Sequence, residues 1–99
     1  MWHFSRYRMY QRIATFFESP RSGRVLAISG AGPIAGMFAP DAEITETAYP
    51  GVDVMALPYG EAAFDYVVAD QVIEHVRQPF VAVDEMRRVL RPGGHAIVT

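Results

Sequence analysis

The stretch RVLAISGAGPIAG, residues 24–36, restricts the folds open to this chain most strongly, because an apolar run passes directly into closely spaced glycines. This order is typical of a buried strand followed by a tight turn and a helix. Gly30, Gly32 and Ala35 fit the spacing G-x-G-x-x-G/A, in which glycines let the backbone approach a pyrophosphate at a helix start. Other ligands, and turns that bind nothing, use the same glycines, so the rest of the chain must discriminate between these alternatives.

Strand and helix patterns alternate along the chain. Strands are predicted where apolar or β-branched residues run or alternate: over 24–29, over 43–48, in FDYVVAD, in HAIVT, and briefly at the start of VDVMALPYGEAA. Helices are predicted after the glycine turn, as a short turn in QVIEHV, and in PFVAVDEMRRVL, which begins at Pro79 and ends at RPGG. The alternation predicts an α/β fold: a Rossmann-like, mostly parallel sheet of at most five strands, flanked by helices, with ligands beyond the carboxyl ends of the strands.

Residues 1–23 are predicted to form an N-terminal amphipathic helix and linker, and residues 24–99 the core domain. Within residues 2–18, apolar side chains recur at spacings near three and four: Trp2, Met9, Ile13, Phe16 and Phe17. This stripe fits a helix that lies on the sheet with its arginines in water. Interleaved aromatic and Arg residues also fit RNA binding. We favour the first interpretation and expect no nucleic-acid partner.

The formal net charge of −2 conceals three blocks of opposite sign. Residues 1–24 carry +4, residues 25–76 carry −8 without any Arg or Lys, and residues 77–99 carry +2. Because the acidic block contains the glycine turn, it disfavours a pyrophosphate and favours a ligand that bears cationic groups. Acids that are merely solvated on the surface would give the same count.

Cysteine is absent, which excludes disulfides and thiolate chemistry and agrees with a reducing compartment. We see no secretory signal and no apolar segment long enough to span a membrane, so the sequence predicts a cytoplasmic protein without a membrane partner. His3 and His95 have no partners at metal-ligand spacing, and no metal is expected.

Two longer stretches, LPYGEAAFDYVVADQVIEHV and FVAVDEMRRVLRPGGHAIVT, resemble the second half of a class I S-adenosylmethionine-dependent methyltransferase core of the type 11 family. The family pattern is Leu-Pro-aromatic, Phe-Asp, an apolar strand, Glu-His, and then Arg-Arg-Val-Leu-Arg-Pro-Gly-Gly before another strand. The resemblance extends over residues 24–99. It implies S-adenosyl-L-methionine as the cofactor, in preference to a nicotinamide or flavin dinucleotide.

The resemblance also implies a set of cofactor-binding residues. The first motif would pass under the methionyl part of the cofactor, and its residues here are Ser29, Gly30, Ala31 and Gly32. Asp53 would accept a hydrogen bond from the adenine amino group, and the Val54 amide would meet a ring nitrogen. Asp70 would lie near the methionyl ammonium. From the residues alone, Asp53 also fits a turn cap, and Asp70 fits the cap of a helix that begins near Gln71.

The chain departs from the family pattern in three places. Ala27 and Ser29 stand where the family has an acid and a glycine, which removes part of the usual hydrogen bonding in the cofactor loop. The full helix between the second and third strands is missing, which leaves Glu46 as the candidate for the acid that binds the ribose. The family sheet has seven strands and this chain supplies about five, so we expect a truncated domain whose open strand edge can self-associate.

By this resemblance, the function is methyl transfer to a small-molecule or glycan acceptor. No catalytic residue is identified, although His75, beside Glu74, is a candidate base for an acceptor that carries a proton. One alternative is a degenerate, non-catalytic methyltransferase-fold module that binds a ligand or partner. Another is a fragment of a dinucleotide-binding oxidoreductase. We expect the 99 residues alone not to be a competent methyltransferase, because HAIVT would lack part of its cover.

Overall fold

A computed structural model describes residues 15–19, 21–28, 32–47, 51–70, 72 and 75–99. Its elements, in chain order, are β1 (Arg24–Ile28), α2 (Gly32–Ala35), β2 (Glu43–Thr47), β3 (Phe64–Ala69), α3 (Pro79–Val89) and β4 (Leu90–Val98). The four strands form one parallel sheet in the order β2-β1-β3-β4. The predicted Rossmann-like α/β fold is therefore confirmed.

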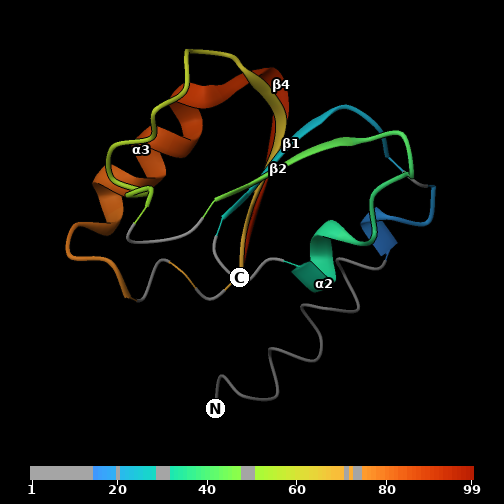
Figure 1. Cartoon of the computed structure of the whole chain (residues 1–99), viewed down its shortest axis with the longest axis horizontal. Helices are drawn as coiled ribbons and strands as arrows, with labels where there is room; N and C mark the ends of the chain where they lie inside the picture. Colours follow the sequence, from blue (N-terminus) through green and yellow to red (C-terminus); the bar gives the residue numbers. More distant parts are fainter. Residues whose placement is uncertain (1–14, 20, 29–31, 48–50, 71, 73–74) are drawn as a thin grey trace.

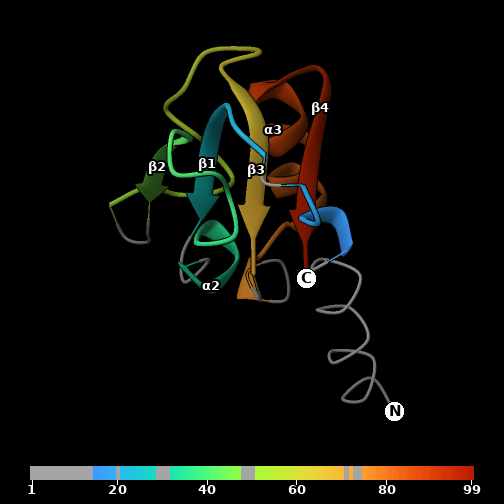
Figure 2. The same ribbon diagram turned by 90° about the vertical axis from the view of Figure 1, so that its right-hand side faces the viewer.

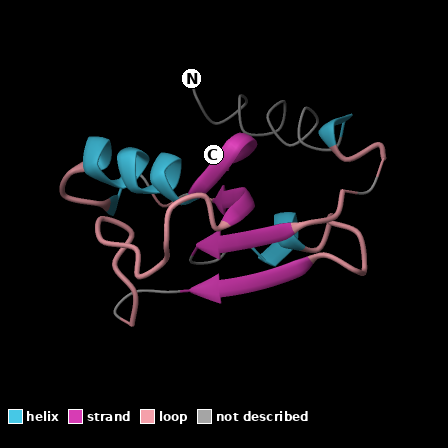
Figure 3. Cartoon of the chain, turned by 90° about the horizontal axis from the view of Figure 1, so that it is seen from above, coloured by secondary structure: helices cyan, strands magenta, loops and turns pink. Residues whose placement is uncertain are grey.

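The helices cover opposite faces of the sheet. Figure 1 shows α3 on the left of the sheet and α2 on the right, and Figure 3 shows the same two sides from above. Leu26 and Val67 pack with α3, whereas Val25 and Val68 pack with α2. These four side chains are fully buried, and each contributes about 1.5–3 kcal/mol of burial free energy. Burial on both faces explains why the two central strands are apolar at nearly every position.

The strand order reverses beside β1. The chain passes from β1 through α2 to β2 on one side, and residues 51–63 then return it to β3 on the other side of β1. All four strands point the same way, and their arrowheads reach one edge in Figure 2. In open parallel sheets, ligands bind beyond the carboxyl ends of strands at such a reversal. The topology therefore places the candidate site at this carboxyl edge.

Most of the predicted N-terminal helix, residues 1–14, lies outside the described residues. Its described end packs aromatic rings on the α2 side of the sheet. The Phe16 ring lies 6.3 Å from Tyr66 and 5.4 Å from His95, and the Phe17 ring lies 4.7 Å from Phe38, measured between centroids. The packing of these two residues agrees with an apolar stripe that faces the sheet. Among the described residues, no helix is long and apolar enough to cross a membrane.

Two details of the predicted strands are corrected. RPGG does not form a turn between helix and strand, because β4 already begins at Leu90. Leu90 pairs with Phe64 and His95 pairs with Tyr66, so β4 bulges between these pairs. Gly93 permits the bulge with a φ of 83°. The short strand expected at the start of VDVMALPYGEAA is an isolated antiparallel bridge between Asp53 and Ala56, because a tight turn closes there before a ladder can form.

Asp65 ties three strands together at the opposite, amino-terminal edge of the sheet. One carboxylate oxygen accepts the backbone N–H of Arg24 at 2.8 Å, and the other accepts the Arg91 side chain. These two interactions link β3 to β1 and β4. The N–H of Arg24 chiefly, and the Arg91 guanidinium next, hold the pKa of Asp65 below its usual value of 3.8.

Gly94 is expected to resist substitution because the bulge brings backbone against it. A Cβ there would lie 2.8 Å from the Asp65 carbonyl oxygen, whereas a Cβ at Gly60 would meet nothing within 4 Å. We expect Gly94→Ala to lower the free energy of unfolding by about 1–3 kcal/mol. The control, Gly60→Ala, should change it by less than about 0.5 kcal/mol. Urea denaturation checks this, and equal midpoints for both variants would contradict the bulge geometry.

Asp65→Asn tests the ion pair at the amino-terminal edge. Because the folded-state pKa of Asp65 is lowered, its stabilisation is complete above about pH 4 and is lost as the pH falls through that lowered pKa. At neutral pH the variant should lose about 0.5–1 kcal/mol of unfolding free energy, the range for a partly exposed pair. Denaturation curves over a pH series should show the difference from wild type shrinking below about pH 4. A constant difference would contradict this assignment.

Candidate functional site

The carboxyl edge of the sheet is closely aligned. Ile28 pairs with Thr47 on one side and Ala69 on the other, and Ala69 pairs with Val98. The last residues of β1, β2, β3 and β4 therefore lie side by side at this edge. Of the predicted first motif, Ser29, Gly30 and Ala31 lie outside the described residues, and Gly32 begins α2.

Asp70 directly follows β3 and is held from the neighbouring strand. Its Oδ1 accepts a hydrogen bond from the hydroxyl of Thr99, whose backbone N–H donates to the Ala69 carbonyl at 3.0 Å. The carboxylate is thus fixed at the carboxyl edge, next to the end of β1. Its predicted contact with a ligand ammonium stays a prediction.

Asp53 and Val54 form a tight turn with the two residues that follow. Asp53 Oδ1 accepts the N–H of Met55 at 2.9 Å, and the Asp53 carbonyl accepts the N–H of Ala56 at 2.9 Å. Asp53 is exposed, whereas Val54 is buried in the same cluster as Ile28 and α3. The turn therefore lies on the α3 face of the sheet, anchored by Val54, with an outward-facing carboxylate.

The end of β2 presents different side chains to the two faces of the sheet. Glu46 pairs with Ala27, which packs on the α2 face, whereas Thr47 pairs with Ile28, which packs on the α3 face. Thr47, not the predicted Glu46, therefore shares a face with the turn at Val54. The Thr47 hydroxyl oxygen is buried and makes no hydrogen bond within the described part of the chain. Thr47 cannot be assigned to this face from the sequence alone, because the two-residue strand period identifies its face only once the register is known.

His75 is exposed, and its backbone N–H donates to the Val72 carbonyl at 3.0 Å. Residues 71, 73 and 74 of the helical turn predicted in QVIEHV, Glu74 among them, lie outside the described residues. The structure thus places His75 in the segment after Asp70, and its role as a base stays a prediction. No group of three or more His, Asp or Glu in the described ranges has a metal-binding arrangement.

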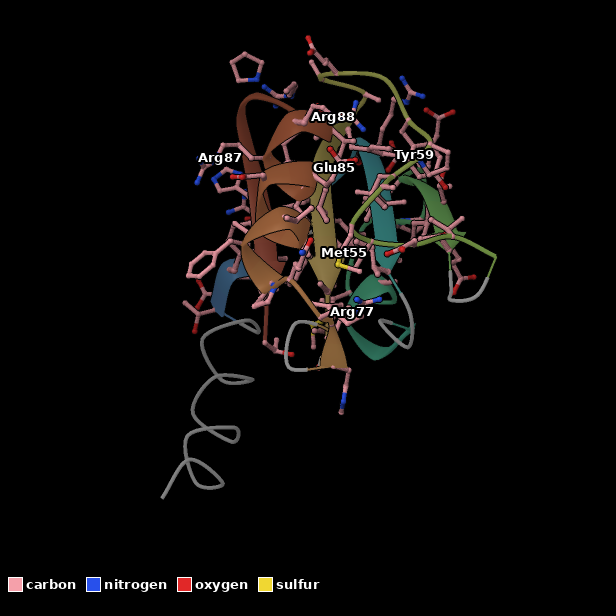
Figure 4. All side chains as sticks on the ribbon, turned by 90° about the vertical axis from the view of Figure 1, so that its left-hand side faces the viewer. Met55, Tyr59, Arg77, Glu85, Arg87 and Arg88 are labelled. Atoms are coloured by element: carbon pink, nitrogen blue, oxygen red, sulfur yellow. The ribbon has the colours of Figure 1, made fainter. Side chains whose placement is uncertain are left out.

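An ion pair on α3, which no sequence pattern predicts, holds the segment that follows the Asp53 turn. Arg88 Nε donates to Glu85 Oε2 at 2.8 Å. Arg88 also donates to the carbonyls of Leu57 at 2.9 Å and Tyr59 at 2.7 Å. Glu85 Oε1 accepts the N–H of Leu57 at 2.8 Å. Figure 4 shows both side chains directed toward the Tyr59 loop.

The two side chains also shift each other's pKa. The hydrogen bond from Arg88 chiefly lowers the pKa of Glu85, and Glu85 in turn raises the pKa of Arg88.

The topology and the Asp70 carboxylate at the carboxyl edge define a Rossmann-like α/β domain with its candidate ligand site at the strand-order reversal. Residues 29–98 match the model of the family described as "Methyltransferase domain". The chain belongs to this family. Membership implies use of S-adenosyl-L-methionine.

Individual relatives agree with this assignment. An uncharacterized methyltransferase of Mycolicibacterium vanbaalenii is 46% identical over 44 residues, which cover 44% of this chain and 17% of the relative. The crystal structure of the [4+2]-cyclase SpnF aligns with a TM-score of 0.68 and 28% identity over 92% of this chain and 43% of that one. A putative methyltransferase of Bacillus halodurans aligns with a TM-score of 0.71 and 18% identity, over 89% of this chain and 48% of that one, and shows the shared fold. This chain thus covers less than half of each of these relatives.

The buried Thr47 hydroxyl is expected to cost stability in the unliganded protein. A buried hydroxyl without a partner costs about 1–3 kcal/mol, so the similarly shaped Thr47→Val should unfold at an equal or higher temperature. Thr45 lies on the same face of β2 but is exposed, so Thr45→Val is the matched control and should change stability by less than about 0.5 kcal/mol. Thermal melts check this. A marked loss of stability confined to Thr47→Val would mean that the hydroxyl has a protein partner.

Proposed function

We propose that this chain forms the cofactor-binding part of an S-adenosyl-L-methionine-dependent methyltransferase that acts on a small-molecule or glycan acceptor. The family match over residues 29–98 is the observation that carries the proposal. The register supports it, because Asp70 lies at the edge where such folds bind their ligands. The Asp53 turn packs through Val54 into the cluster that contains Ile28, the last residue of β1.

The described residues fit this cofactor chemically. The Asp53 carboxylate faces outward and would accept the adenine amino group, while the adjacent Val54 amide would meet a ring nitrogen. Thr47 offers a buried hydroxyl on the same face, suited to a ribose hydroxyl, in place of the predicted Glu46. Asp70 would hold the methionyl ammonium. An acidic middle block that contains no Arg or Lys favours a ligand with a sulfonium and an ammonium over a pyrophosphate.

The reaction requires little covalent help from the protein. The bound cofactor supplies a methyl group already activated by its sulfonium, and the chain's own residues orient the ligand and exclude water. Val54 and Leu57 supply the apolar wall on the α3 face of the sheet. If the acceptor carries a proton, exposed His75 is the candidate base in the segment after β3.

A second candidate function is a non-catalytic module of the same fold. A fold of this kind does not require methyl transfer, because SpnF, a [4+2]-cyclase, aligns over 92% of this chain. Ala27 and Ser29, which depart from the family's first motif, favour this alternative. Isothermal titration with S-adenosylmethionine, and with a nicotinamide dinucleotide as comparator, separates the alternatives. Binding of the first alone supports the proposal, and binding of neither favours the non-catalytic module.

Asp53→Asn tests the adenine contact without removing the turn. The amide oxygen can still accept the Met55 N–H, while its NH₂ group replaces the acceptor offered to the adenine amino group. Losing a hydrogen bond to a charged acceptor costs about 1.5–3 kcal/mol, so we expect affinity for S-adenosylmethionine to fall about ten- to a hundredfold. Calorimetry measures the affinity, and an unchanged melting temperature shows that the turn persists. A change below about twofold would leave Asp53 only its role in the turn.

A further inference from the structure

We infer that Glu85 and Arg88 are positioning residues for the cofactor, acting by holding both backbone groups of Leu57 and thereby fixing the Asp53–Ala56 turn. The inference rests on the proposed function, because the proposed function assigns the Asp53 turn to adenine recognition. It concerns residues on α3, outside the carboxyl-edge loops and far along the chain from the turn.

The pair takes over the hydrogen bonding that a strand ladder would otherwise supply. Leu57 N–H donates to Glu85 and Leu57 C=O accepts from Arg88, so one ion pair satisfies both backbone groups of this residue. Arg88 reaches further along the same segment, donating to the Tyr59 carbonyl and accepting the N–H of Ala62 at its own carbonyl. Buried backbone groups need partners, and this segment obtains them from two side chains of α3. The path of residues 57–62 therefore depends on the pair.

The Asp53 turn is followed directly by Leu57, the residue whose backbone Glu85 and Arg88 hold. Ala56 closes the turn by donating to the Asp53 carbonyl, and Leu57 is the next residue. Val54 and Leu57 are both buried in the cluster that includes Ile28, so the turn is fixed by apolar packing as well as by the pair. A shift of Leu57 must move the turn, because only the bonds of one residue separate them. The Asp53 carboxylate itself is exposed and has no such packing.

The geometry indicates that Glu85 and Arg88 position the segment around Leu57 and do not only bond to each other. The two side chains are 20% and 32% exposed, and Arg88 uses Nε and both terminal nitrogens on three separate groups. A planar guanidinium can hold several acceptors at fixed angles, which the single ammonium of Lys cannot do. Arg87, which directly precedes Arg88 on the helix, is exposed and points away from the Tyr59 loop in Figure 4. It provides a control of equal size and charge.

The test measures S-adenosylmethionine affinity in Arg88→Met, Arg88→Lys and the control Arg87→Met, each alone and combined with Asp53→Asn. We expect Arg88→Met to weaken binding about tenfold, Arg88→Lys to recover part of this, and Arg87→Met to stay within about twofold. In the Asp53→Asn background, Arg88→Met should cost less than about threefold more, because both changes remove the same contact. An undiminished cost in that background, or unchanged affinity in folded Arg88→Met, would overturn the inference.

A second measurement does not need the ligand. Amide hydrogen exchange of Ala56 and Leu57 should accelerate at least about tenfold in Glu85→Gln and Arg88→Lys, relative to amides of β1 in the same protein. Acceleration without any S-adenosylmethionine binding by the wild type would uphold the anchoring of the turn and reject the proposed function. Equal protection of Ala56 and Leu57 in wild type and variants would reject the anchoring itself. These two variants keep polar side chains, so they serve if Arg88→Met does not fold.

Discussion

The pairing of β1 between β2 and β3 is the constraint on which the rest of the structure depends. β1 is the strand beside which the order reverses, and its side chains enter both apolar clusters, Val25 and Ala27 on one face and Leu26 and Ile28 on the other. A one-residue slip of its register would exchange these two faces and expose or bury the wrong side chains. The same register aligns Ile28, Thr47 and Ala69, so the packing of the core and the placement of the candidate site are set together.

The two ends of the sheet are held by different physical interactions. At the amino-terminal edge, Asp65 links three strands through one backbone N–H and one guanidinium. At the carboxyl edge, the described polar groups include the carboxylate of Asp70, which accepts the Thr99 hydroxyl, and the buried hydroxyl of Thr47, which has no partner in the described residues. A buried hydroxyl without a protein partner needs an explanation, and a ligand bound at the carboxyl edge would supply the missing hydrogen bond.

The strands and helices could be predicted from the sequence because their patterns are local. Apolar runs and Pro79 identified β1, β3 and the start of α3 to within a residue or so. The bulge in β4 could not be predicted, because the same Pro-Gly-Gly that normally ends a helix also permits a bulge, and only the pairing with Phe64 decides between them. Thr47 required the register of β2, and the contacts of Glu85 and Arg88 required knowledge of how the loop crosses α3.

The register of β1 and β2 also bears on Ala27, which stands where the family pattern has an acid. Ala27 is buried among apolar side chains on the α2 face, and its cross-strand partner on that face is Glu46. If residue 27 were the acid of the family pattern, two carboxylates would stand directly opposite each other, and like charges in that arrangement are destabilising. Ala27 and Glu46 therefore fit together as a pair in which the neighbouring strand carries the acid. The register therefore puts the Glu46 carboxylate on the α2 face of β2 and the Thr47 side chain on the α3 face, where the turn at Val54 also packs.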